Sequence, residues 1–159
     1  MQKNFSHNLI VGKIGEIVFE QMFREAGKFT ILRSGYEYLL PELAQYQDRN
    51  ELKNVIAHIR KLPDFILISP DHTKVYLVEA KYRTHPNPDE MLKIAKEMLA
   101  KWDMPWLFLA SPYGFNFDSC RNVVKNNGNI EKLFPTTVPQ EIQNKYLKLL
   151  MEFQRPLKK

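Results

Sequence analysis

The sequence predicts an α/β fold in which helices flank a mixed central β-sheet. Three patterns indicate this class: helical stripes near both ends and in the middle of the chain, two apolar runs around a turn, and a further apolar run after the middle helix. With 159 residues, of which 44% are apolar, the chain suits one domain with a sizeable core. We therefore expect a single domain over residues 1–159.

The first expected element is a helix over 11–26, because its apolar residues recur at helical spacing and Gly27 stands where a helix would end. Within it, Glu20 and Arg24 are one turn apart and can form an ion pair. Extended chain is expected over 29–40. A short helix is expected near 50–60, before Pro63.

Two apolar runs, 65–69 and 74–82, flank a stretch with turn chemistry and predict a β-hairpin. In both runs, odd- and even-numbered positions alike carry apolar residues. Both faces of each strand should therefore be buried, which places the hairpin centrally in its sheet. With Asp71 and His72 at the tip, the register places Ser69 opposite Lys74. The same register places Asp64 opposite Glu79.

The second half of the chain predicts a helix over 88–102, with Asn87 as its N-cap and Pro88 at its first position. A buried strand is expected over 105–110. Residues 111–139 contain many Pro and Gly residues and are expected to be irregular, and a last amphipathic helix is expected over 140–153. The predicted order is therefore helix, strand, hairpin, helix, strand and an additional helix.

The composition excludes several classes of protein. A disulfide scaffold is excluded because Cys120 is the only cysteine, and 12% aromatic with 26% charged residues argues against global disorder. Cys120 is expected to be a structural thiol. The net charge of +5 permits a polyanionic partner but does not demand one. Because no apolar run reaches the roughly 18 residues of a membrane span and no secretory pattern opens the chain, we expect a soluble, cytoplasmic protein with no membrane partner.

Charged residues gather at one end of the predicted hairpin. Side chains alternate along a strand, so Glu79 and Lys81 share a face, and the register brings Asp64 to that face too. Two facing carboxylates repel each other unless a cation lies between them, and oxygen ligands suit a divalent ion. Glu16 and Glu20 of the first helix are candidates for a further ligand. Glu16 is the better one, because Arg24 accounts for Glu20.

Two carboxylates beside a lysine suit metal-assisted hydrolysis of a phosphodiester. A bound metal polarises the phosphoryl oxygen and lowers the pKa of a bound water. The ammonium group of Lys81 can orient that water or stabilise charge at the phosphorus centre.

Pro63-Asp64, fourteen further residues and Glu79-Ala80-Lys81 resemble the signature of the PD-(D/E)xK nuclease superfamily. The resemblance covers about residues 11–110, with 111–159 as a C-terminal extension, and it implies a restriction-endonuclease-like core of helix, three strands, helix and strand. Gly15-Glu16 fits the position of a helical glutamate in that family. The small size also resembles Holliday-junction resolvases. Glu51-Leu52-Lys53 has the same tripeptide pattern in an expected helix, so context rather than the tripeptide carries the resemblance.

The resemblance implies roles for individual residues. Asp64 and Glu79 would hold Mg²⁺ or Mn²⁺ together with Glu16 and the backbone carbonyl of Ala80, and Lys81 would position or activate the attacking water. The implied substrate is DNA, with RNA not excluded, and the implied assembly is a homodimer. Basic residues are expected to contact the nucleic-acid backbone, namely Lys81, Arg83, Lys93 and Lys96.

Other interpretations stay open at this point. The chain fits a non-catalytic module with a nuclease-like fold that binds nucleic acid or an acidic protein, and it fits a structural subunit whose charged cluster caps the hairpin. Arg83 is equally explained as a solvated strand end, and Lys93 and Lys96 as a solvated helix face. Residues 41–61 and 111–159 lie outside the common core, so we expect substrate choice or dimer contacts there. The sequence does not separate endonuclease from exonuclease action.

Overall fold

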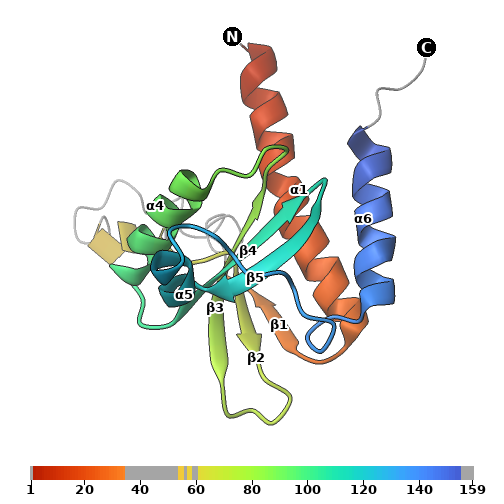
Figure 1. The fold of residues 1–159 in the computed structure, drawn as a ribbon. Coiled ribbons are helices and arrows are strands. Elements are labelled where there is room, and N and C mark those ends of the chain that lie inside the picture. Colours follow the sequence, from red (N-terminus) through yellow and green to blue (C-terminus); the bar gives the residue numbers. More distant parts are fainter. Residues whose placement is uncertain (1, 35–53, 56, 59–60, 155–159) are drawn as a thin grey trace.

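A computed structural model describes residues 2–34, 54–55, 57–58 and 61–154 of the chain (Figure 1). At its centre lies a five-stranded sheet with the strand order β1-β2-β3-β4-β5. Strands β3 and β4 are parallel and the other neighbouring pairs are antiparallel. The predicted α/β class with a mixed sheet is therefore confirmed. The strands are β1 (Thr30–Arg33), β2 (Phe65–Ile68), β3 (Val75–Tyr82), β4 (Pro105–Ser111) and β5 (Gly114–Ser119).

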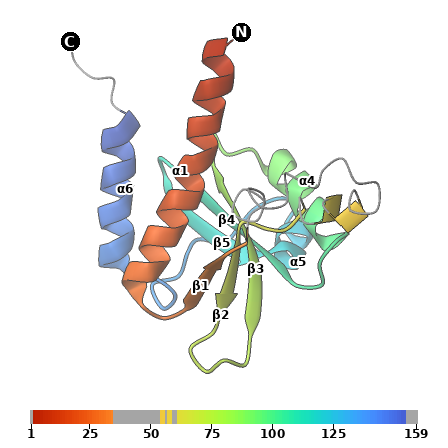
Figure 2. The same cartoon turned by 180° about the vertical axis from the view of Figure 1, so that it is seen from behind.

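Helices cover the two faces of this sheet (Figures 1 and 2). Helix α1 (Gln2–Ala26) packs on one face with α6 (Gln140–Gln154) beside it, and α4 (Pro88–Leu99) and α5 (Cys120–Lys125) pack together on the other. The larger half of the core lies under α1, where the rings of Phe19, Phe23 and Phe108 are in contact. None of the described helices is long and apolar enough to cross a bilayer.

The hairpin has the predicted register. Phe65 pairs with Val78, and the Ser69 amide donates a 3.0 Å hydrogen bond to the Lys74 carbonyl. Strands β2 and β3 are internal to the sheet, as predicted. Val78 is buried beneath α1, whereas Leu77 on the other face is only half-buried. The prediction that both faces of the hairpin are buried therefore holds for the face under α1, whereas the face toward α4 is only partly buried.

The predicted helix over 88–102 ends at Leu99 instead. Its start is as expected: Asn87 has extended backbone angles, and its side chain accepts a hydrogen bond from the Asp89 amide. At its end the Ala100 amide bonds back into the last turn. Pro105 cannot continue a helix, and it disfavours helical backbone angles at the residue before it, so the helix ends before this proline. As a result, Trp102 lies beyond the helix.

The expectation that residues 111–139 are irregular is wrong, because β5 and α5 lie there. Gly114 has a φ of 131° and permits the tight turn between β4 and β5, where it pairs with Ser111. Ser119 then caps α5 by accepting a hydrogen bond from the Asn122 amide. The turn-forming residues of this stretch separate short elements rather than replace them.

Two expected elements lie partly outside the described residues. The extended stretch over 29–40 is confirmed as β1, and 35–40 fall outside the described part. Of the helix expected near 50–60, residues 54–55 and 57–58 are helical, and the remainder, which includes the tripeptide Glu51-Leu52-Lys53, lies outside the described residues. The first helix begins at Gln2 rather than at residue 11, and Gly27 follows its end with a φ of 66°.

Candidate functional site

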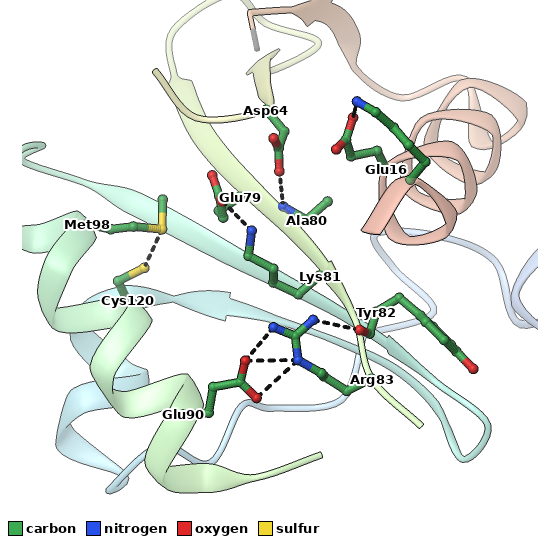
Figure 3. A network of polar contacts seen from close by, with 11 residues as sticks. Glu16, Asp64, Glu79, Ala80, Lys81, Tyr82, Arg83, Glu90, Met98 and Cys120 are labelled. Carbon is green, nitrogen blue, oxygen red and sulfur yellow. Dashed lines mark hydrogen bonds and ion pairs between the residues drawn. The ribbon is translucent and has the colours of Figure 1, made fainter. Parts of the chain in front are cut away.

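The structure brings Asp64, Glu79 and Lys81 together across the hairpin (Figure 3). Asp64 directly precedes β2, and its Oδ2 accepts a 2.9 Å hydrogen bond from the amide of Ala80 on β3. On the same strand, the Lys81 ammonium group donates to Glu79 Oε1 over 2.5 Å. The carboxylate of Asp64 is thus tied to the peptide between the other two charged residues, as the register predicts.

Glu16 reaches this cluster because α1 packs unusually close to β3. Gly15 lies against the backbone of that strand: a Cβ at this position would stand 2.7 Å from the Lys81 carbonyl carbon and 2.8 Å from the Tyr82 nitrogen. Only glycine fits such an approach. The next residue, Glu16, pairs with Lys13 at 3.0 Å and is close enough to Asp64 to affect its ionisation. The Gly-Glu pair in the sequence therefore has a structural reason.

Burial and neighbouring charges together set the pKa values of Asp64 and Lys81. Burial raises the pKa of Asp64 to about 7, with repulsion from Glu79 and Glu16 adding to the effect of burial while Lys81 and the Ala80 amide oppose it. Burial alone would lower the pKa of Lys81. The carboxylates of Glu79 and Asp64 outweigh that effect and raise it, so Lys81 remains an ammonium ion at neutral pH.

The acidic side chains of this cluster are of the ligand type that a hard divalent cation takes. Asp64, Glu79 and Glu16 offer carboxylate oxygens, the ligands that Mg²⁺ prefers, and repulsion from Glu79 and Glu16 adds to burial in raising the pKa of Asp64. Among the described residues, no three acidic, histidine or cysteine side chains form a preassembled metal cage. Lys81 instead supplies the positive charge beside Glu79.

A cleft of about 270 Å³ opens from this cluster toward α4. Glu79 and Lys81 lie on its β3 side, and the cleft is rimmed by Lys61, Lys101 and Trp102. Sequence reasoning did not assign these three to the site. Lys101 continues the series of basic residues that starts with Lys93 and Lys96, and this series is the sequence signal that pointed toward it; nothing in the sequence pointed to Lys61.

The expected phosphate contacts are only partly placed near this cleft. Lys81 lines it, whereas Lys93 and Lys96 are exposed on α4 and do not. Arg83 forms a forked ion pair with Glu90, with Nε 2.9 Å from Oε1, and also donates to the Tyr82 carbonyl. Arg83 thus ties the end of β3 to the first turn of α4.

Glu20 is not part of the site. It is buried beneath β1, where Arg24 and Arg33 both pair with its carboxylate. Burial alone would raise the pKa of Glu20, but the hydrogen bonds from the two guanidinium groups lower it overall. The pairing with Arg24 was predicted, and β1 adds Arg33.

Comparison of the chain with protein-family models, with curated proteins and with solved structures gives no match. Function therefore has to be inferred from the site itself. The described part of that site offers a partly buried acid of raised pKa, two further carboxylates, a protonated lysine and a cleft with a basic rim. Carboxylate oxygens are the ligand type of hard cations, and basic side chains attract anions.

Proposed function

We propose that this protein is a metal-dependent nuclease that hydrolyses phosphodiester bonds in DNA. The observation that carries the proposal is the hydrogen bond between Asp64 and the Ala80 amide, which joins an acid at the start of β2 to the Glu79–Lys81 pair on β3. The order of α1, β1, β2, β3, α4 and β4 supports a restriction-endonuclease-like core, the fold that the sequence signature implies.

In this proposal, Asp64, Glu79, Glu16 and the Ala80 carbonyl hold Mg²⁺ or Mn²⁺. When bound, such an ion would supply polarisation of a phosphoryl oxygen and a lower pKa for a coordinated water. Lys81 keeps its proton and holds the attacking water or offsets negative charge on the phosphorus centre.

The cleft supplies the place for the sugar-phosphate backbone. Lys61 and Lys101 stand at its rim, where their charges attract phosphate groups without reading sequence. Trp102 lies beside Lys101 in the same rim and offers a ring face to a base or sugar. These contacts account for binding, and the acids account for cleavage.

One observation favours a second candidate function, a non-catalytic module that binds nucleic acid through the same cleft. The Lys81–Glu79 ion pair is short at 2.5 Å and satisfies Glu79 without any metal. A protein whose lysine stays locked in this way binds DNA in the cleft and leaves it intact.

Cleavage assays separate the two candidates. The protein is incubated with linear duplex, branched and single-stranded DNA and with RNA, in Mg²⁺, in Mn²⁺ and in chelator. Asp64→Asn and Lys81→Ala are run beside two matched surface controls, Asp103→Asn and Lys148→Ala. Metal-dependent cutting that both site variants lose and both controls keep supports the nuclease. Binding without cutting supports the module, and neither binding nor cutting contradicts both.

A further inference from the structure

The cleft beside the acid–lysine cluster has both a charged and an apolar lining. Val78 and Ala80 belong to the core under α1, so the alternation of side chains along β3 puts Glu79 and Lys81 on the other face of the sheet, where the cleft lies. Half of the described lining residues are apolar, namely Leu62, Pro63, Ile94, Met98 and Trp102. A phosphate group gains nothing from apolar surface, so this part of the lining fits another part of a ligand.

Helix α4 supplies one wall of the cleft. Ile94, Glu97 and Met98 follow one another at three- and four-residue spacing on this helix, and Lys101 continues the same side just beyond its end. The amide of the next residue, Trp102, donates a 2.9 Å hydrogen bond to the Met98 carbonyl, which holds the half-buried tryptophan against the last turn. An aromatic ring beside a lysine is the combination with which proteins bind a base and its phosphate.

Glu97 adds an acidic group that phosphate binding does not explain. It lines the cleft from α4, whereas Glu79 is paired with Lys81 on β3. A carboxylate repels a phosphate, but it accepts hydrogen bonds from the amino groups of bases. The position of Glu97 therefore favours a base inside the cleft, with the phosphates toward the lysines of the rim.

The size of the cleft suits a single nucleotide. Its volume of about 270 Å³ lies below the roughly 300–1,000 Å³ of pockets that enclose drug-sized ligands. In an intact duplex the bases are paired and stacked on one another, so their faces are not free to enter such a cleft. In a single strand the bases can turn outward and stack on an aromatic side chain. The apolar lining is therefore useful only to an unpaired nucleotide.

We propose that the cleft receives one unpaired nucleotide beside the acid–lysine cluster, so that the protein binds single-stranded DNA in preference to an intact duplex. The base stacks on Trp102 and presents its N–H groups to Glu97, while Lys61 and Lys101 contact the neighbouring phosphates. This inference rests on the proposed function, because it defines which form of DNA reaches Glu79 and Lys81.

Three probes of equal length test the preference, by fluorescence anisotropy in chelator and at one salt concentration. They are a 24-nucleotide DNA strand, the same strand paired with its complement, and a strand with the same sugar-phosphate backbone but no bases. The duplex carries the most phosphates, so charge alone favours the duplex. We expect the strand to bind tighter than the duplex, and roughly five- to 150-fold tighter than the abasic strand. Equal or tighter binding of either other probe would overturn the proposal.

Variants of the rim separate the base contact from the phosphate contact. Trp102→Ala should bind the strand and the abasic strand alike, whereas Trp102→Phe keeps a ring and should keep most of the preference. Lys101→Ala should weaken both probes by the same factor, because both carry the phosphates. Lys148→Ala on α6 is the control and should bind as the wild type does. If Trp102→Ala does not fold, the three probes on the wild type still decide. A preference that survives in folded Trp102→Ala contradicts the proposal.

Cleavage in Mg²⁺ distinguishes a failure of this inference from a failure of the proposed function. Faster cleavage of the strand than of the duplex supports both. Cleavage of the duplex at an equal or higher rate contradicts the preference for an unpaired nucleotide and leaves the nuclease standing. Tighter binding of the strand with no cleavage of either DNA contradicts the nuclease and supports the nucleotide site.

Discussion

Gly15 of α1 touches the backbone of Lys81 on β3 so closely that a methyl group would stand 2.7 Å from the Lys81 carbonyl carbon. This contact fixes the distance between helix and sheet at the level of the acid–lysine cluster. Because Glu16 is the next residue, the same contact decides how near its carboxylate comes to Asp64. The close packing of Gly15 on β3 therefore also determines the geometry of the acid–lysine cluster.

Gly15→Ala should separate α1 from β3 and so lower both stability and activity. Overpacking of this kind costs about 1–3 kcal/mol in the free energy of unfolding, measured by urea denaturation. Gly12→Ala is a matched control, because nothing lies within 4 Å of a Cβ there. The control should stabilise the helix by up to about 1 kcal/mol. Equal effects of the two substitutions would contradict the close contact.

Asp64→Asn should make the metal-free protein more stable at neutral pH and above. The pKa of Asp64 is raised to about 7 in the folded protein from a usual value of 3.8, so the folded state binds its proton more tightly than the unfolded chain. Stability from this group is therefore present at low pH and is lost as the pH rises from about 4 to about 7. Asp64→Asn has no carboxyl group to ionise here, so the variant does not lose this stability as the pH rises.

Thermal melts at pH 5 and pH 8 measure this difference. In chelator at pH 8, the variant should melt several degrees above the wild type, since about 1 kcal/mol moves the midpoint by roughly 2–4 °C in a protein of this size. At pH 5 the difference in melting temperature between the variant and the wild type should be smaller. Added Mg²⁺ should then stabilise the wild type at pH 8 but not the variant. A variant that melts below the wild type at pH 8 would contradict the uncompensated charge of Asp64.

The register of the hairpin could be predicted because its turn residues and its apolar runs agree on one pairing. Once Asp71 and His72 stood at the tip, the opposition of Asp64 and Glu79 followed. Separate local reasoning favoured Glu16 over Glu20, because Arg24 stands one helical turn from Glu20 and pairs with it. It needed no knowledge of the rest of the fold.

Other parts of the site could not be predicted, because they depend on contacts between distant segments. Lys61 and Lys101 meet at the cleft only once α4 has packed on the sheet. For Arg83 the sequence left open a contact with the nucleic-acid backbone and a solvated strand end, and it did not indicate the ion pair with Glu90, which lies across the connection to α4. Strand β5 was missed because its glycine and polar residues resemble a loop until β4 provides a partner for Gly114.

Glu16→Gln and Glu20→Gln should separate activity from stability. Glu20 is buried between two arginines, so its loss should cost about 1–3 kcal/mol in the free energy of unfolding and leave activity intact while the protein is folded. Glu16 is only partly buried, so its loss should leave stability nearly unchanged and reduce metal-dependent cleavage. Urea denaturation and cleavage rates measure the two effects, and the reverse pattern would show that Glu20 belongs to the site.

The lowered pKa of Glu20 can be tested by measuring stability as the pH is lowered. Its ion pairs contribute stability above the usual carboxyl pKa of about 4.5, and this contribution is lost as the pH falls through the lower pKa of the folded state. The wild type should therefore lose its stability advantage over Glu20→Gln on acidification. A difference that stays constant from pH 7 to pH 3 would contradict this role.

Cys120 should be inert in the native protein. It is fully buried, its Sγ contacts the sulfur of Met98 at 3.8 Å, and burial raises the pKa of the thiol to about 12. Since the thiolate is the reactive form, a disulfide reagent should modify Cys120 only after denaturant unfolds the chain. Rapid modification of the folded protein would contradict this packing. Cys120→Ala should keep the cleavage activity.

The most direct test of the proposed function is the rate at which the wild type and Lys81→Ala cleave a labelled DNA as Mg²⁺ is raised from zero. The account predicts saturable, chelator-sensitive cleavage by the wild type. It predicts a rate at least about a hundredfold lower for Lys81→Ala, the usual effect of removing a group that acts on the proton or charge of the transition state. Equal rates for the two proteins, or cleavage that persists in chelator, would contradict a metal-dependent nuclease built on Asp64, Glu79 and Lys81.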